Sequence, residues 1–294
     1  MRVLITGAAG RIGRNVTREL IEVGFDVVAT DAVYRRDLGF SLRVADLTDR
    51  LSIYPLMEGC DSLIHLGNLP NSQAAQPAQR VLVENTAINT YTFAAAAELG
   101  LERVVFISSI QATTGADGTQ SYWKPLTPSR LSRLPLDGDL PRNPGFNYYG
   151  QSKAFGEQML EIMAQHDESL RAITLRLPYV WPTDPEMIRR HLHPFRPHDH
   201  RLQECLCHLT MADAVHVIRA ALEKASPGYR TYFPAVSLSV EGLTPTQIAE
   251  QHLAHIPVRG PLDGPGGLVD VSALERDLGW TPTLPVATLP RADD

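Results

Sequence analysis

The feature that most constrains the fold of this chain is a glycine-rich turn formed by Gly7, Gly10 and Gly13. An apolar run over residues 1–6 precedes the turn and predicts a buried strand, and apolar residues recur at helical spacing over 16–23. Glycines at a strand-to-helix turn let the backbone approach a pyrophosphate closely, and the N-terminus of the helix offers N–H groups to that anion. The turn therefore predicts a dinucleotide-binding site near the start of the chain.

Strands and helices alternate through the first half of the sequence. Apolar runs over 25–30, 62–66 and 103–107 predict further strands, and the patterns over 83–99 and 149–165 predict helices. Such alternation is typical of an α/β fold of the Rossmann type, a doubly wound parallel sheet with helices on both faces and right-handed crossovers.

Two stretches interrupt this regular pattern. Residues 113–145 are rich in Pro, Gly, Ser and Asp, which predicts a functional flap or a partly mobile segment. After residues 175–178 the alternation becomes irregular. We therefore predict a Rossmann domain over 1–177, including the helix over 149–165, and a smaller C-terminal substrate lobe over 178–294. The pattern leaves open whether segments of the second half return to the main sheet.

Length and composition narrow the class of protein. A chain of 294 residues is long enough for a large core, and its formal net charge of −6 gives no reason to expect nucleic-acid binding. No apolar run is long enough to span a bilayer, and the immediate first strand leaves no room for a signal peptide. The three cysteines do not form a disulfide framework. We therefore expect a cytoplasmic protein.

An acidic residue at the end of the second predicted strand indicates which dinucleotide is bound. Asp31 lies about twenty residues beyond the glycine turn, where a carboxylate accepts hydrogen bonds from the adenosine ribose hydroxyls and repels a 2′-phosphate. This favours NAD over NADP, although Arg35 and Arg36 keep NADP as the less favoured alternative. Asp46 and Leu47, at the end of a third predicted strand, are placed to contact the adenine, and Asp46 alternatively caps a helix.

The candidate catalytic groups are a Tyr/Lys pair and a serine. Tyr149 and Lys153 are four residues apart on a predicted helix and therefore project from one face. A lysine ammonium beside a tyrosine favours its phenolate, which can take a proton from a substrate hydroxyl. Ser108 and Ser109 end a predicted strand, where open parallel sheets bind their ligands. By counting from the start of that strand we assign Ser109 to the reacting oxygen.

Together these features resemble the extended short-chain dehydrogenase/reductase family, and within it the NAD-dependent epimerase/dehydratase branch. Segments 64–67, 175–178, 208–214 and 278–282 also match the family's pattern. The resemblance implies that Tyr149 is the general acid/base, that Lys153 lowers the pKa of Tyr149 and binds the nicotinamide ribose, and that Ser109 orients the substrate oxygen. It also implies a homodimer that packs through the helices over 85–99 and 149–165. The cofactor-binding residues that we predict are Gly7, Gly10, Arg11, Ile12, Gly13, Asp31, Asp46, Leu47, Leu66, Asn85, Tyr149 and Lys153.

Departures from the family pattern bear on the substrate. Thr114 stands where the family usually has a tyrosine, and the lobe after Pro178 is short for gripping a whole nucleotide-sugar, which favours a smaller substrate. The substrate-binding residues that we predict are Asn68, Gln111, Arg189 and Arg190. The two arginines lie in an Arg- and His-rich stretch that suits an anionic group, or that forms a solvated loop. The spacing of its histidines and cysteines fits no standard zinc site, so we expect no metal.

Three functions remain compatible with these residues. The leading one is an NAD-dependent oxidoreductase that acts on a hydroxyl of a sugar, sugar acid or similar small polyol. The alternative is an NAD-dependent nucleotide-sugar epimerase or dehydratase that retains its cofactor, because the first oxidation step is the same. A further alternative is a non-catalytic dinucleotide-binding sensor, against which the intact Tyr149/Lys153 pair argues.

Overall fold

A computed structural model describes residues 1–71, 74–114, 131–181, 184, 202, 204–237 and 242–283. Its centre is a seven-stranded sheet in which every neighbouring pair of strands is parallel. The strands are, in spatial order, β3 (Arg43–Val44), β2 (Asp26–Asp31), β1 (Arg2–Thr6), β4 (Ser62–His65), β5 (Arg103–Ser109), β6 (Arg171–Leu177) and β9 (Gly228–Tyr232). The order reverses between β1 and β4, and ligands bind outside the carboxyl ends of the strands at such a switch point.

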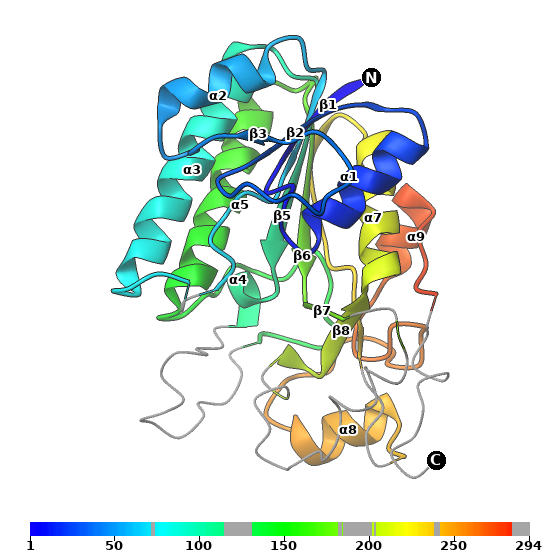
Figure 1. Cartoon of the computed structure of the whole chain (residues 1–294). Coiled ribbons are helices and arrows are strands. Elements are labelled where there is room, and N and C mark those ends of the chain that lie inside the picture. The colour runs from blue at the N-terminus through cyan, green and yellow to red at the C-terminus, as the bar shows by residue number, and fades with distance from the viewer. Residues whose placement is uncertain are drawn as a thin grey trace.

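Helices cover both faces of this sheet, as a doubly wound fold requires (Figure 1). One face carries α2 (Arg50–Met57), α3 (Gln79–Glu98) and α5 (Tyr148–His166), and the other carries α1 (Gly13–Glu22), α7 (Met211–Lys224) and α9 (Ser272–Leu278). The sheet separates two hydrophobic clusters because alternate residues of each strand point to opposite faces, as with Leu4 and Ile5 of β1. The observed architecture confirms the predicted α/β, Rossmann-type fold.

A smaller sheet lies beside the carboxyl ends of the main strands. It consists of β10 (Val236–Ser237), β8 (Cys207–Thr210) and β7 (Tyr179–Trp181), in that order. Near it lie the short helices α4 (Gln111–Thr114) and α8 (Pro245–His252). The second half of the chain therefore contributes to both sheets, because β9 pairs with β6 at the edge of the main one. The division into domains at residue 177 remains a prediction.

The described part of the irregular segment, from residue 131 onward, packs into the core. Leu134 and Leu136 are fully buried, and each forms an isolated bridge to the C-terminal part of the chain, with Val258 and Val269 respectively. This stretch therefore connects the two parts of the molecule, and the expectation of a flap or mobile segment does not apply to it. No helix among the described residues is long and apolar enough to cross a membrane.

Candidate active site

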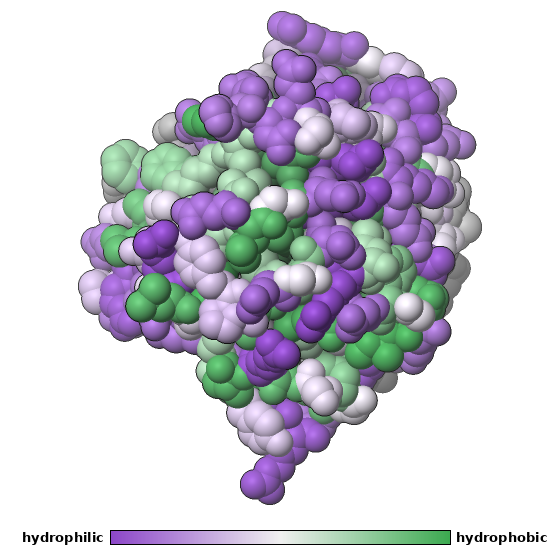
Figure 2. Space-filling model, turned by 90° about the horizontal axis from the view of Figure 1, so that it is seen from above, coloured by the Kyte–Doolittle hydropathy of each residue, from purple (hydrophilic) through white to green (hydrophobic). Residues whose placement is uncertain are grey.

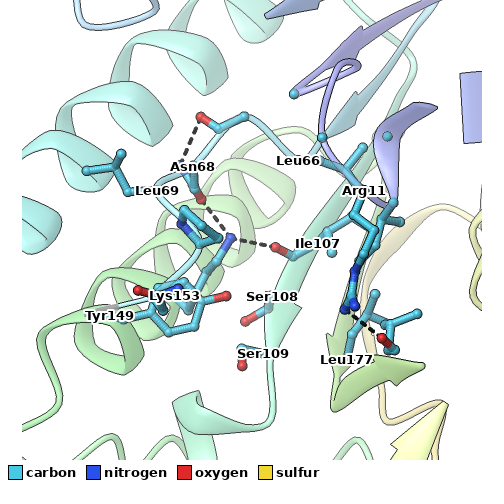
Figure 3. A pocket seen from close by; sticks show the side chains of 18 of the residues that line it. Arg11, Leu66, Asn68, Leu69, Ile107, Ser108, Ser109, Tyr149, Lys153 and Leu177 are labelled. Atoms are coloured by element: carbon cyan, nitrogen blue, oxygen red, sulfur yellow. Dashed lines mark hydrogen bonds between the residues drawn. The ribbon is translucent and has the colours of Figure 1, made fainter. Parts of the chain in front are cut away.

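A cavity of about 800 Å³ opens at the carboxyl ends of β1, β2, β4, β5 and β6. This volume lies within the range of cofactor and small-molecule sites, roughly 300–1,000 Å³. The cavity walls bring together most of the residues predicted from sequence (Figure 3). The predicted residues that line it are Gly7, Gly10, Arg11, Ile12, Gly13, Asp31, Asp46, Leu47, Leu66, Asn68, Ser109, Gln111, Tyr149 and Lys153.

The glycine turn forms one end of this cavity, and its geometry requires glycine. Gly7 has a φ of 68°, and a Cβ there would lie 2.7 Å from the carbonyl carbon of Leu66. A Cβ on Gly13 would lie 2.1 Å from the carbonyl oxygen of Gly7. No side chain caps the start of α1, where Ile12 and Gly13 line the cavity, and the partial positive charge of a helix N-terminus attracts an anion. These observations fit a bound pyrophosphate.

Asp31 is the last residue of β2 and lines the same end of the cavity. Its Oδ2 accepts a hydrogen bond from the Ala9 N–H at 2.9 Å, so the carboxylate is held against the glycine turn. Arg35, one of the two residues that leave NADP as an alternative cofactor, forms an ion pair with Asp37 at 3.0 Å. Asp46 accepts hydrogen bonds from the N–H and hydroxyl of Thr48, and these lower its pKa. Asp46 thus stabilises a local turn at the cavity wall.

Arg11 crosses from the glycine turn to the second lobe. Its Nη2 donates to the carbonyl oxygen of Val180 at 2.5 Å, and its guanidinium lies 4.9 Å from the ring centroid of Tyr179. The labelled Arg11 in Figure 3 spans this side of the cavity. The strand after β6 is therefore tied directly to the turn that is expected to hold the cofactor.

The other end of the cavity holds the candidate catalytic groups. Tyr149 and Lys153 project from α5 toward the end of β5, where Ser109 lies (Figure 3). Ser109 forms a hydrogen bond with Tyr149. Ser108 instead donates from its hydroxyl to Glu157 at 2.6 Å, inside the protein. The geometry favours Ser109 over Ser108 for the reacting oxygen.

The pKa of Tyr149 differs from the sequence expectation. In the protein alone, burial raises it to about 12, which outweighs the opposing hydrogen bond from Ser109. Burial also lowers the pKa of Lys153 to about 7, because desolvation disfavours the ammonium. Burial therefore dominates the pKa of Tyr149 in the protein without cofactor, and the role of Lys153 in lowering that pKa stays a prediction. The nicotinamide ring of a bound NAD would add positive charge to the site, which favours the phenolate.

A buried polar network holds Lys153, and sequence reasoning missed most of it. The Lys153 ammonium donates to the carbonyl oxygen of Ile107 and to Oδ1 of Asn68, both at 2.7 Å. Asn68 in turn donates to Oδ1 of Asn89 at 2.8 Å, and the same oxygen lies 3.0 Å from Nε2 of His65. Asn68 therefore positions Lys153, and its predicted contact with substrate stays a prediction.

The tautomer of His65 follows from its neighbours. Thr6 accepts hydrogen bonds from two backbone N–H groups, those of Leu66 and Gly67, so its hydroxyl donates to Nδ1 of His65 at 2.7 Å. Nε2 then carries the proton and donates to Asn89. Burial, together with the charge of Lys153, lowers the pKa of His65 to about 3, so the ring is neutral. A histidine inside an apolar strand was the sequence signal for this network.

Asn85 is not brought into the cavity wall. It lies within α3, and its side chain bonds the backbone N–H and carbonyl of Leu69 at 2.7 and 3.1 Å and the Ser152 hydroxyl at 3.1 Å. Asn85 thus holds the loop after β4, and its predicted contact with the cofactor stays a prediction. Arg189 and Arg190 lie outside the described residues. Among the described residues, no group of three or more His, Cys, Asp or Glu side chains could hold a metal ion.

The fold and the site together define a dinucleotide-binding protein with a Tyr/Lys/Ser centre. Residues 3–183 match the model of the NAD dependent epimerase/dehydratase family. The chain belongs to this family. The assignment confirms the predicted class, an NAD-dependent enzyme with a Rossmann-type fold.

Several named relatives are similar over part of the chain. An L-arabinose 1-dehydrogenase (NAD(P)(+)) of Haloferax volcanii is 31% identical over 186 residues, which cover 62% of this chain and 68% of that protein. A uronate dehydrogenase of Pseudomonas syringae is 28% identical over 162 residues, 54% of this chain and 52% of that protein. The match thus spans only about half the length of the uronate enzyme.

Solved structures resemble the whole chain. A UDP-glucose 4-epimerase from Bifidobacterium longum, in complex with NAD+ and UDP, has a TM-score of 0.70 and 18% identity, and the match covers 98% of this chain and 96% of that one. At this identity the likeness supports the fold alone.

Proposed function

We propose that this protein is an NAD-dependent oxidoreductase that oxidises a hydroxyl of a sugar, sugar acid or similar small polyol. One observation carries the proposal. Ser109, Tyr149 and Lys153 meet in the same cavity that the glycine turn and Asp31 enter from the other end. A dinucleotide seated on the turn would extend toward the tyrosine.

The arrangement of side chains supports a proton transfer at Tyr149. Ser109 holds the substrate oxygen beside the phenol, and Tyr149 takes the hydroxyl proton as the neighbouring C–H bond breaks. When bound, NAD supplies the acceptor for the hydride that leaves that carbon. Lys153, held by Asn68 and Ile107, stabilises the phenolate by its charge. The products are a carbonyl compound, NADH and one proton.

The sugar substrate class is supported by the named relatives, which include enzymes for L-arabinose and for uronates. The epimerase alternative is supported by the match of residues 3–183 to the NAD dependent epimerase/dehydratase family, and both functions use the same first step.

A homodimer through α3 and α5 is part of the proposal. The two helices border a groove of about 510 Å³ whose walls include Phe93, Ala97 and Met163. Ile162 and Val83, on the same helices, are 57% and 65% exposed. Hydrophobic areas appear in Figure 2 on the left, the side where α3 and α5 lie in Figure 1. Light scattering should give twice the chain mass, and Ile162→Glu should give the monomer.

The proposed activity is tested by incubating the purified protein with NAD and a panel of substrates. The panel contains L-arabinose, D-galactose, D-galacturonate and UDP-glucose, and Tyr149→Phe serves as the inactive control. Net formation of NADH with a free sugar is the expected result. Conversion of UDP-glucose without net NADH would establish the epimerase instead, and NAD binding without any turnover would establish the sensor.

A further inference from the structure

Glu204 lines the same cavity as Ser109, Gln111 and Tyr149, although it lies in a segment that the sequence analysis did not assign to the site. It precedes β8, and the two residues after it, Cys205 and Leu206, adopt left-handed φ angles of 51° and 54°. Both are buried, at 0% and 1% exposure. Left-handed backbone is unfavourable for such side chains, so the surrounding core must hold this turn in place.

A chain of hydrogen bonds defines what Glu204 offers to the cavity. The N–H of Gly150 donates to Oδ1 of Asn147, so the amide nitrogen of Asn147 donates to Oε1 of Gln111 at 2.7 Å. The amide nitrogen of Gln111 therefore donates to Oε1 of Glu204 at 3.2 Å. Both amides are oriented by this sequence of donors and acceptors. Glu204 is thus held as a hydrogen-bond acceptor.

The charges along the cavity differ between its two ends. Among the described residues, the charged side chains that line it are Arg11, Asp31, Asp46, Lys153 and Glu204. Arg11 is bonded to Val180, Asp31 and Asp46 belong to the glycine-turn end, and Lys153 is bonded to Asn68 and Ile107. Near Tyr149 the cavity thus has Lys153, whose Nζ lies 5.7 Å from the Tyr149 ring centroid, and the acidic Glu204, whose charge raises the pKa of Tyr149. Burial raises the pKa of Glu204, and the hydrogen bond from Gln111 opposes this shift by stabilising the carboxylate.

We propose that Glu204 selects a neutral, polyhydroxylated substrate over an anionic one. Its carboxylate accepts a hydrogen bond from a sugar hydroxyl near the one that is oxidised, and it repels a carboxylate in the same place. Hydroxyl groups are donors that a carboxylate with a free oxygen can pair, whereas two carboxylates at close range cannot both remain charged without a large cost. This inference rests on the proposed function and chooses the neutral sugars within it over the sugar acids.

The test uses D-galactose and D-galacturonate, which differ only in a CH2OH or a carboxylate at one carbon. The wild-type protein should oxidise galactose with a kcat/KM at least tenfold above that for galacturonate. Glu204→Gln should reduce this ratio at least tenfold, because the neutral amide no longer repels the anion. Glu204→Asp keeps the charge, so it should keep the preference while lowering kcat/KM for galactose. Glu168→Gln, at an exposed site after α5, is the control and should change neither value.

The outcomes separate this inference from the proposed function. If the sugars are oxidised but Glu204→Gln leaves the ratio of their kcat/KM values unaltered, the role of Glu204 is overturned and the proposed function stands. A wild-type preference for galacturonate would have the same meaning. If no compound of the substrate panel is oxidised, the proposed function fails, and the affinity of galactose and galacturonate for the NADH complex is measured by calorimetry instead. In that measurement, tighter binding of galactose than of galacturonate, lost in Glu204→Gln, would still support the inference. Failure of both sugars to bind would overturn it.

Discussion

The two ends of the active-site cavity are built in different ways. The glycine-turn end comes mainly from residues 7–13 and Asp31, and the contacts that shape it involve backbone atoms, such as the hydrogen bond from the Ala9 N–H to Asp31. The Tyr149 end joins residues from β5, α4, α5 and the stretch before β8, and side-chain amides connect them. We infer that the end proposed for the common cofactor is specified mainly by a local motif, whereas the end proposed for the substrate depends on long-range packing.

Replacing Tyr149 should produce the largest effect of all. Only the Tyr149 end of the cavity should be affected. We expect Tyr149→Phe to lower kcat by about 10²–10⁴-fold, the usual contribution of a general acid/base. The dissociation constant of NADH, measured by fluorescence titration, should stay within about twofold. Tyr148→Phe is the matched control, since Tyr148 is not among the described residues that line the cavity. A fully active Tyr149→Phe protein would refute the assignment.

Crowding the glycine turn should affect the opposite end. In Gly13→Ala the new Cβ would meet the Gly7 carbonyl oxygen at 2.1 Å, so the turn must shift. Overpacking of this kind costs about 1–3 kcal/mol, which would weaken NADH binding by roughly 5–150-fold. Gly264→Ala, where an added Cβ meets nothing within 4 Å, is the control. Unchanged NADH affinity in Gly13→Ala would show that the cofactor does not rest on this turn.

Acid should weaken the network that joins the two ends. The pKa of His65 is about 3 in the folded protein and about 6.5 when unfolded, so its stabilising effect is complete above pH 6.5 and declines as the pH falls toward 3. Between pH 7 and pH 5 the free energy of unfolding should drop by about 2 kcal/mol from this residue alone.

Urea unfolding at the two pH values measures this drop. His65→Gln has no titrating group at this position, so its stability should fall less over the same interval. The buried His208, whose pKa is lowered to about 4, contributes equally to both proteins. An identical pH dependence in the two proteins would show that His65 is not buried as a neutral ring.

Substitutions of Asn147 should have a smaller effect, and they separate its role in orienting the Tyr149 end from its role in stability. Asn147 caps α5 and also orients Gln111, so Asn147→Ala should cost about 1 kcal/mol of stability and raise the KM of the sugar severalfold. Asn147→Ser keeps a capping hydroxyl, and it should restore the stability without restoring KM. The affinity for NADH should not change in either variant. Recovery of KM together with stability in the serine variant would contradict the role in orientation.

The sequence was most informative where function depends on neighbours along the chain. The glycine turn, Asp31 and the Tyr149/Lys153 spacing are local patterns, and the structure places all of them around one cavity. Glu204 could not be found in this way, because its place depends on a turn fixed by buried residues and on an amide 93 residues earlier in the chain. The direction of the pKa shift of Tyr149 was also missed, since spacing reveals a neighbouring lysine but not the desolvation of both groups.

The pairing of β9 with β6 has a consequence for the synthesis of this protein. Arg171 of β6 pairs with Gly228 of β9, which leaves the ribosome 57 residues later, as the difference between the two positions gives. At roughly 5–20 residues per second, the edge of β6 stays open for about 3–11 s after its own translation. During that interval the nascent chain already contains the glycine turn, Ser109 and Tyr149, yet it presents an unpaired strand that favours aggregation. Chaperone binding to nascent chains should therefore peak before residue 228 has emerged.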